Sequence, residues 1–305
     1  MLNRRQFIRN LGAGAVGTIV VNLPFDAFAA GDYTKITILH TNDFHSHIDP
    51  FPADAPRNAD EGGMAQRASL ISKIRSEEKS VLLFDAGDIY QGSPYFNYFK
   101  GELEFKLMTQ MGYDAATIGN HEFDNGLEGI ESQLKNAGFP FVVSNYDFSD
   151  TILAGKTIQY KIFHRHGIKV GVYGLCIELD GLVSKKNYGN TNYIDPLVTA
   201  LKMEKMLKQE KNCDLVICLS HLGYSYKEDK ISDKIVAAET FFTDLIIGGH
   251  THTFLQKPDE IINKAGKKVL VNQVGYGGLI LGRIDFYMSK DRKTRKEQSE
   301  NLPVK

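Results

Sequence analysis

The chain has 305 residues, of which 42% are hydrophobic, and its formal net charge is -1 at pH 7. This length and apolar content suffice for one large core or for two domains. The near-neutral charge gives no electrostatic case for binding a nucleic-acid polymer. Three cysteines, an odd number with no C-x-x-C spacing, argue against a disulfide framework, so we expect buried, inert thiols at Cys176, Cys213 and Cys218.

The first residues have the pattern of a targeting segment. Asn3-Arg4-Arg5-Gln6-Phe7-Ile8 is similar to a twin-arginine export signal. The Gly- and Ala-rich apolar region from Leu11 to Leu23 is too short to span a membrane, and Ala27-Phe28-Ala29 fits a small-x-small cleavage site. We predict a signal peptide of the twin-arginine type over residues 1–29, export to the periplasm, and no transmembrane span. The alternative is a frayed N-terminus of a cytoplasmic protein.

Short apolar runs alternate with helical patterns along the rest of the chain. In order, we expect a strand over 34–39, a helix over 63–80, a strand over 81–84, a helix over 102–111, a strand over 115–118, a helix over 127–137 and a strand over 141–144. There follow a hairpin of 158–163 with 168–175, a helix over 196–211, a strand over 215–219, a helix over 233–238, a strand over 245–247, and a closing strand pair over 268–274 and 279–287.

This alternation predicts one layered α/β domain over residues 30–289, with mixed sheets inside and helices outside. Residues 290–305 are charged and have no apolar period, so we expect a flexible tail there.

Five of the strand-like runs end in His, Asp or Asn. The polar residues at these ends are Asp43 and His45, Asp88, Asn120 and His121, His221, and His250 with His252. Ligand sites in α/β sheets lie beyond the carboxyl ends of the strands. We therefore expect these loops to converge on one crevice.

Seven of these side chains are candidate metal ligands: Asp43, His45, Asp88, Asn120, His221, His250 and His252. Seven mixed nitrogen and oxygen ligands exceed one four-coordinate zinc site and fit two ions that share a carboxylate. Two such ions about 3.5 to 4 Å apart are a common device for cleaving phosphoesters. Each residue alone has a structural interpretation, such as a helix cap for Asp88 or a buried hydrogen-bonded ring for His221. Their shared position after strands favours the metal site.

The order of these motifs resembles that of the calcineurin-like metallophosphoesterases, and more specifically the catalytic N-terminal domain of the 5′-nucleotidases. The resemblance is carried by Thr41-Asn42-Asp43-Phe44-His45, Gly87-Asp88-x-x-Gln91-Gly92, Asn120-His121-Glu122-Phe123-Asp124, His221 and Gly249-His250-x-His252. It covers roughly residues 34–288. It implies a four-layer α-β-β-α sandwich (the metallophosphatase fold) with two mixed β-sheets and two divalent ions between the sheet ends. Zn, Mn, Fe and Co all accept such ligands.

The resemblance also implies roles. One ion would take Asp43, His45, Asp88 and His252, and the other Asp88, Asn120, His221 and His250, so that Asp88 is the bridge. His121 would be a catalytic imidazole oriented by Asp124, and the spacing of three residues allows that contact. Asn120 and His121 would also bind substrate. An imidazolium at His121 can stabilise phosphoryl charge or protonate the leaving alkoxide, and a structural role is the alternative.

The expected function is therefore that of an exported phosphohydrolase that cleaves phosphate monoesters, with nucleoside 5′-monophosphates favoured, by attack of metal-bound hydroxide. The two-domain nucleotidases hold the nucleoside with a separate C-terminal domain, and this chain ends before one. Either a separate nucleotidase C-terminal-domain protein is a partner, or the substrate differs. Alternatives are a cyclic-nucleotide phosphodiesterase, a catalytic subunit that is inactive without its substrate-binding chain, and a hydrolase of sulfur esters. Four aromatic residues flank the Asp88 loop, and core packing is favoured for them over base stacking: Tyr90, Tyr95, Phe96 and Tyr98.

Overall fold

The computed structural model describes residues 33–292 and 294–305, and Thr34–Lys305 form one compact unit. The predicted signal peptide over residues 1–29 lies outside the described residues. Within the described part, none of the helices combines the length and hydrophobicity needed to cross a bilayer.

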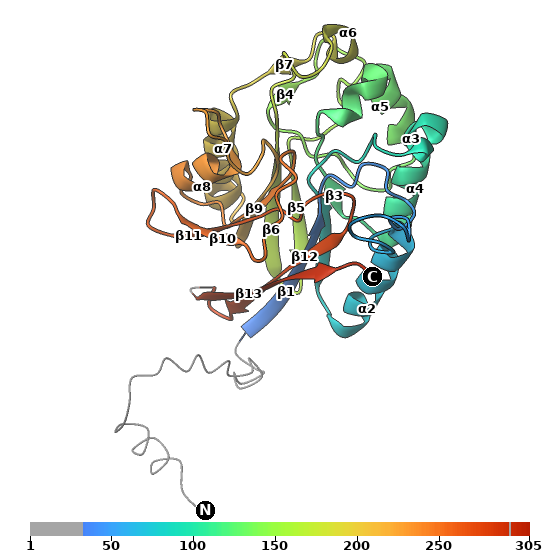
Figure 1. The fold of residues 1–305 in the computed structure, drawn as a ribbon. Helices are drawn as coiled ribbons and strands as arrows, with labels where there is room; N and C mark the ends of the chain where they lie inside the picture. The colour runs from blue at the N-terminus through green and yellow to red at the C-terminus, as the bar shows by residue number, and fades with distance from the viewer. Residues whose placement is uncertain (1–32, 293) are drawn as a thin grey trace, which may run out of the picture. The chain divides into compact units, whose positions relative to one another are not determined.

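The first of two mixed sheets has the strand order β13-β12-β1-β2-β3 (Figure 1). Strands β1 (Tyr33–Thr41), β2 (Val81–Asp85) and β3 (Ala115–Ala116) are parallel neighbours. Strands β12 (Ile280–Ser289) and β13 (Arg295–Pro303) pair antiparallel at the other side. The carboxyl ends of β1, β2 and β3 therefore meet at one edge of this sheet.

The second sheet has the order β10-β11-β9-β8-β6-β5. Its four central strands are parallel: β6 (Ile168–Cys176), β8 (Leu215–His221), β9 (Leu245–Gly248) and β11 (Lys268–Asn272). Its outer strands β5 (Tyr160–Arg165) and β10 (Asp259–Ile262) are antiparallel to their neighbours. A separate two-stranded ribbon pairs β4 (Tyr146–Asp147) with β7 (Asn192–Tyr193). The predicted 158–175 hairpin is thus confirmed as β5 and β6.

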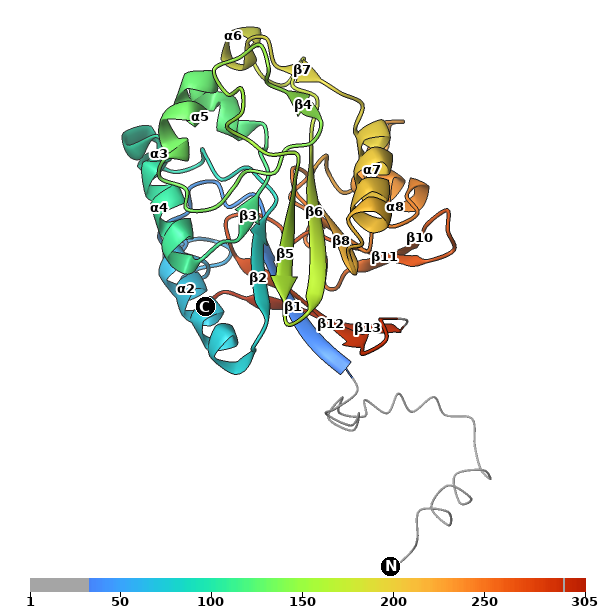
Figure 2. The same ribbon diagram turned by 180° about the vertical axis from the view of Figure 1, so that it is seen from behind.

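Helices cover the outer faces of both sheets (Figures 1 and 2). On the first sheet lie α2 (Met64–Glu77), α3 (Pro94–Phe99), α4 (Glu102–Met111) and α5 (Gly126–Leu134). On the second lie α8 (Asp233–Glu239) and α7 (Pro196–Lys205), which continues as the π-helical turn η3 (Met206–Glu210). The short helix α6 (Lys185–Tyr188) lies beside the β4–β7 ribbon, as the first view shows.

Three apolar clusters fill the spaces between the four layers. Successive side chains of β2 point to opposite faces of the sheet, so this one strand contributes to two of the clusters. Leu82 and Phe84 enter the cluster between the sheets, together with Ile217 of β8, whereas Leu83 enters the cluster beneath the helices. A third cluster packs Val216 of β8 against α7 and α8. The four-layer α-β-β-α sandwich expected from the sequence is confirmed, and the three cysteines are free and buried, as predicted.

The prediction of a flexible tail over residues 290–305 is wrong. Residues 295–303 form β13, which pairs with β12 from Ile280↔Pro303 to Met288↔Arg295, and Val304 is buried. The strand is an edge strand with charged side chains, a common protection against edge-to-edge association. That is why it lacks the apolar alternation by which a half-buried strand is recognised. The domain therefore extends beyond the predicted boundary at residue 289.

The expected pairing of 268–274 with 279–287 is also wrong. Strand β11 lies in the second sheet and β12 in the first, so the segment between them crosses from one sheet to the other. Residues 141–144 form only isolated bridges, from Phe141 to Ala116 and from Val142 to Ile158.

Candidate metal centre

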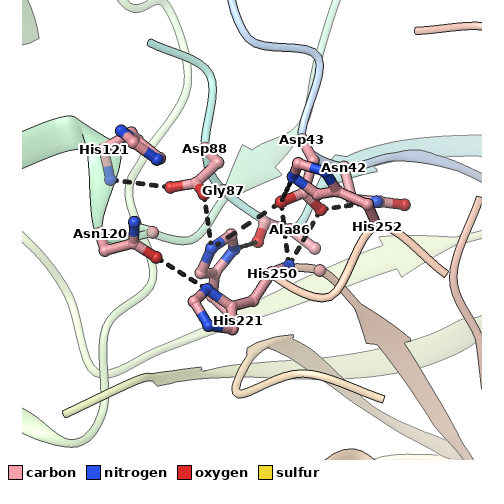
Figure 3. Close-up of polar contacts among 12 residues, drawn as sticks. Asn42, Asp43, Ala86, Gly87, Asp88, Asn120, His121, His221, His250 and His252 are labelled. Carbon is pink, nitrogen blue, oxygen red and sulfur yellow. Dashed lines mark hydrogen bonds and ion pairs between the residues drawn. The ribbon is translucent and has the colours of Figure 1, made fainter. Parts of the chain in front are cut away.

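The loops that carry the predicted residues meet at the carboxyl ends of the parallel strands. In the first sheet, Asp43 follows β1, Asp88 follows β2 and Asn120 follows β3. In the second sheet, His221 is the last residue of β8, and His250 follows β9. Figure 3 shows these side chains directed toward one another from both sheets. All seven candidate ligands are brought together, as is the pair His121 and Asp124.

The backbone at this edge adopts conformations that L-residues rarely take. Five of the seven candidate ligands have a left-handed backbone: Asp43 (φ 47°), His45 (φ 49°), Asp88 (φ 55°), His250 (φ 71°) and His252 (φ 51°). Each such residue costs on the order of 1–3 kcal/mol and persists only when surrounding structure fixes it. Strain gathered in this way marks a functional site more often than a structural one.

The carboxylate of Glu122 fixes two of the loops. It lies on the 3-10 turn η2 (His121–Asn125) and is fully buried. It accepts hydrogen bonds from the backbone N–H groups of Asp88 (3.0 Å), Ile89 (2.7 Å), Tyr90 (3.2 Å) and Gly119 (2.6 Å). One side chain therefore ties the loop after β2 to the loop after β3.

The inner part of the centre contains Asp88, His221 and His250, with Asn120 beside them. His221 Nδ1 lies 2.6 Å from the carbonyl oxygen of Ala86, which can only accept, so Nδ1 carries the proton. Its Nε2 is buried and lies 3.0 Å from Asp88 Oδ2. His250 Nδ1 lies 2.8 Å from Asn120 Oδ1.

The outer part contains Asp43, His45 and His252. His45 Nδ1 faces the carbonyl oxygen of Tyr90 at 3.2 Å, so its Nε2 is left as an acceptor, 2.9 Å from His252 Nε2. His252 Nε2 is also 3.4 Å from Asp43 Oδ1. The amide of Asn42 donates to Asp43 Oδ2 (2.7 Å) and holds that carboxylate in place.

Asp88 connects the two parts. It belongs to the inner group and also to a third group of potential ligand atoms, with His45 and His121. His45 Nε2 lies 4.0 Å from both Asp88 Oδ2 and Asp43 Oδ1. Asp88 therefore lies between the inner and outer parts, where the sequence analysis predicts the bridging ligand.

His121 lies at the rim of the centre. Its backbone N–H donates to Asp88 Oδ1 (2.8 Å), and its ring Nδ1 lies 2.9 Å from Asp124 Oδ2. Both side chains are about one-third exposed, at 33% and 32%. The predicted contact of His121 with Asp124 is present, and the ring remains open to a substrate.

Burial and neighbouring charges move several pKa values at the centre. Burial alone would lower the pKa of His221, but Asp88 and Asp43 outweigh that effect and raise the pKa to about 10. Burial would raise the pKa of Asp88, yet the adjacent His221 holds it below its usual range. Burial lowers the pKa of His250 to about 4. Perturbed groups concentrated in this way are typical of functional sites.

The ligand atoms themselves test whether cations fit here. In each of the three groups, ring nitrogens and carboxylate oxygens lie within 4.8 Å of one another. The raised pKa of His221 means that, at neutral pH, a proton lies between its Nε2 and Asp88 Oδ2, and a bound cation would displace that proton. Imidazole nitrogens and carboxylate oxygens that converge in this way are ligands that a divalent cation binds. The residues present therefore fit metal ions. The division of ligands between two ions and the role of each residue stay predictions.

Two residues that position ligands had no assigned role in the sequence. Asn42 donates to Asp43 and accepts from the N–H of Val274 (3.0 Å), and Glu122 ties two loops. Both lie inside the motifs quoted above, so a signal existed, but most of their partners are backbone groups distant in the sequence. Of the four aromatic residues near the Asp88 loop, Tyr90 and Phe96 pack in the core, whereas Tyr98 is 83% exposed.

Residues 36–254 match the family model of the calcineurin-like phosphoesterases. The chain belongs to the calcineurin-like phosphoesterase family. Members of this family use a dimetal centre, in agreement with the converging acceptors described above.

Within the calcineurin-like phosphoesterases, this chain is similar to 5′-nucleotidases. It is 34% identical to the 5′-nucleotidase of Rattus norvegicus over 275 residues, covering 83% of this chain and 46% of the rat protein. The crystal structure of the 5′-nucleotidase precursor of Thermus thermophilus superposes with a TM-score of 0.81 and 30% identity, covering 89% of this chain and 55% of that one. The NAD nucleotidase of Haemophilus influenzae gives a TM-score of 0.78 and 26% identity, covering 89% of this chain and 56% of that one. The chain thus spans about half the length of these relatives.

Proposed function

We propose that this chain hydrolyses phosphate monoesters with the help of two divalent ions, and that nucleoside 5′-monophosphates are its substrate class. The observation that carries the proposal is the arrangement of His121 beside Asp88, the residue common to two of the potential ligand groups. The similarity to 5′-nucleotidases supports the choice of nucleotides. When bound, the two ions would hold the phosphoryl oxygens, acidify a water and neutralise developing charge.

The side chains of this chain then supply orientation and a proton. Asp124 accepts from Nδ1 of His121, so the ring presents its other nitrogen to the substrate. The hydrogen bond to Asp124 raises the pKa of His121 and favours the imidazolium. An imidazolium in this position protonates the leaving alkoxide as the P–O bond breaks. The amide of Asn120, at the start of the same turn, is available to the ester oxygens.

A substrate panel tests the proposal. The purified protein, loaded with Mn²⁺ or Zn²⁺, is given AMP, p-nitrophenyl phosphate, bis(p-nitrophenyl) phosphate and a cyclic nucleotide, and product release is measured. We expect turnover of the monoesters and little of the diesters, with EDTA-treated protein as the inactive control. Faster cleavage of the diesters would replace the proposal with a phosphodiesterase.

A second candidate is a catalytic subunit that depends on another chain for substrate recognition. The matched region covers 46% of the rat 5′-nucleotidase and 55% of the Thermus thermophilus precursor, so nucleoside recognition in those proteins can involve residues outside it. In that case, the loaded protein alone turns over none of the panel. Adding a nucleotidase C-terminal domain as a separate chain then restores hydrolysis of AMP.

We also propose that the chain is exported. The Arg4-Arg5 pair and the apolar region after it support export by the twin-arginine route. Fractionation of cells that express the full chain should place it outside the cytoplasm, and replacing both arginines with lysine should retain it inside. An unchanged distribution of the double variant would contradict this route.

A further inference from the structure

A glycine-rich loop with one aromatic residue lies beside the metal centre. Gly275-Tyr276-Gly277-Gly278 follows β11, which is parallel to β9, so this loop emerges at the same sheet edge as His250. The N–H of Gly277 donates to the carbonyl oxygen of Asp43 (2.8 Å), and the Asn42 amide donates to the carbonyl oxygen of Gly275 (2.7 Å). The position of Tyr276 is therefore fixed relative to a candidate metal ligand.

Tyr276 is the middle of a group of rings that extends outward from the centre. It stacks on His252, with ring centroids 5.3 Å apart and an interplanar angle of 25°. It meets Phe254 edge-to-face (5.8 Å, 76°) and Phe51 edge-to-face (6.3 Å, 79°). We call Phe51, Phe254 and Tyr276 the aromatic platform. It is separated from the candidate ligands by a single ring contact.

The backbone is shaped to hold these rings. A Cβ atom at Gly275 would lie 2.1 Å from the Phe254 ring, and one at Gly277 would lie 2.9 Å from the Phe51 ring. Both glycines have a left-handed backbone, with φ of 75° and 67°. Glycine is the residue that permits both the conformation and the close approach. The flanking rings thus occupy gaps that the two glycines leave open.

The platform is open to solvent. Phe254 is 50% exposed, and Phe51 and Tyr276 are partly exposed. Single exposed apolar rings are ordinary on a protein surface, but a contiguous group next to a polar centre indicates a binding surface. Aromatic faces accept planar rings without selecting one base strongly, because every nucleobase has a π-face.

We propose that the aromatic platform binds the planar ring of the substrate's leaving group, a nucleobase when the ester is a nucleotide; this inference rests on the proposed function. The phosphoryl group would lie among the candidate ligands, and the nucleoside would extend past His252 onto Tyr276 and Phe254. The chain would then carry its own base-binding surface. The protein would then prefer nucleotides to sugar phosphates that lack a base, and it would discriminate only weakly among the bases.

The test compares AMP with ribose 5-phosphate, which has the same ester and sugar but no base. In metal-loaded Phe254→Ala, we expect the KM for AMP to rise about tenfold, a typical effect for loss of one stacking ring. We expect kcat for AMP and kcat/KM for ribose 5-phosphate to stay unchanged. Phe254→Tyr keeps a ring and should retain the wild-type KM. Tyr98→Ala removes an exposed ring of α3 outside the platform and should alter neither substrate.

Equal losses on both substrates in Phe254→Ala would show a structural role and overturn the proposal, as would no change on either. If the wild-type protein hydrolyses neither ester, the proposed function fails and the platform is judged by binding alone. Saturation-transfer NMR with adenosine then provides the measurement. Signals from the base protons that weaken in Phe254→Ala and return in Phe254→Tyr support the platform, and equal signals in all three proteins overturn it.

Discussion

The two ends of strand β1 each carry a cluster of charged side chains, and the clusters differ in how their atoms are paired. At the amino end, Lys35 lies 2.6 Å from Glu78 and 3.0 Å from Asp285. Arg283 lies 3.0 Å from the same Asp285, which also accepts from Thr37 (2.7 Å). At the carboxyl end, beyond Thr41, lies the metal centre.

At the amino end every acceptor that forms the network faces a donor, so the cluster is complete with protein atoms alone. At the carboxyl end, the ion-pair partners of Asp43 and Asp88 among the described residues are histidines alone, without a lysine or arginine. Both clusters contain buried carboxylates, so burial does not distinguish them. The difference teaches that a metal centre is recognised by carboxylates that face imidazoles, which can give up a proton and bind a cation, rather than by the density of charge.

The largest effect on metal content and activity is expected when Asp is replaced by Asn at the carboxyl end of β1. The same replacement at the amino end is the control. Asp88→Asn removes the charge that both parts of the centre share, and we expect loss of both ions and activity below detection. Metal content by mass spectrometry of the purified protein is the measurement. Asp285→Asn is the matched control and should keep both ions. Full metal occupancy in Asp88→Asn would show that the bridge lies elsewhere.

The second-largest effect on activity is expected at His121, and it separates catalysis from metal binding. His121→Ala should reduce kcat by about 10² to 10⁴, the usual contribution of a general acid, with metal content unchanged. The ring of His121 contacts Asp124, whereas its backbone N–H, which the substitution keeps, holds Asp88. Loss of one ion in this variant would assign the imidazole to the ligands instead.

A smaller effect concerns pH. The hydrogen bond to Asp124 raises the pKa of His121, so the imidazolium is fully present at low pH and is lost as pH rises through this raised value. Activity that needs the imidazolium therefore falls on the alkaline side. Asp124→Asn removes the stabilising charge, so the alkaline limb of the kcat profile should move to lower pH, and kcat should fall about 10- to 100-fold. An unmoved limb would mean that another group controls it.

The smallest effect is expected at the amino end of β1. Asp285→Asn should lower the free energy of unfolding by about 1–2 kcal/mol, between the values for exposed and buried ion pairs. Activity should stay within about twofold of the wild type. Urea unfolding measures the first and the substrate assay the second. Glu131→Gln, in the exposed pair with Lys156, is the control and should change stability by less than about 0.5 kcal/mol.

Much of the centre could be predicted because its signal is local. Asp43, Asp88 and Asn120 each follow a short apolar run, and a strand followed by a polar loop is visible within about ten residues. The rule that sites lie beyond the carboxyl ends of strands then brings the loops together. The rest depends on contacts between distant segments. Glu122 has no role in the sequence analysis because three of its four partners are N–H groups more than thirty positions away.

The two wrong predictions about the fold also concern contacts between segments that are distant in the sequence. The segment between β11 and β12 resembles a hairpin turn because glycines cluster there, and only the sheet order shows that the chain changes sheets. Strand β13 is recognised by its pairing with β12 and not by its own composition. The sheet to which a strand belongs is decided by the strand it pairs with, and a single sequence does not identify that partner.

The left-handed backbone at the candidate ligands has a consequence for how this protein tolerates change. At Asp43, His45, Asp88, His250 and His252, glycine would relieve a conformation that every other residue adopts at a cost. Selection for folding stability alone would therefore favour glycine at each position, and glycine has no side chain that could bind a metal. Variants selected only for heat resistance should accumulate glycine at these five positions. The resulting protein would be more stable but would lack the candidate metal ligands.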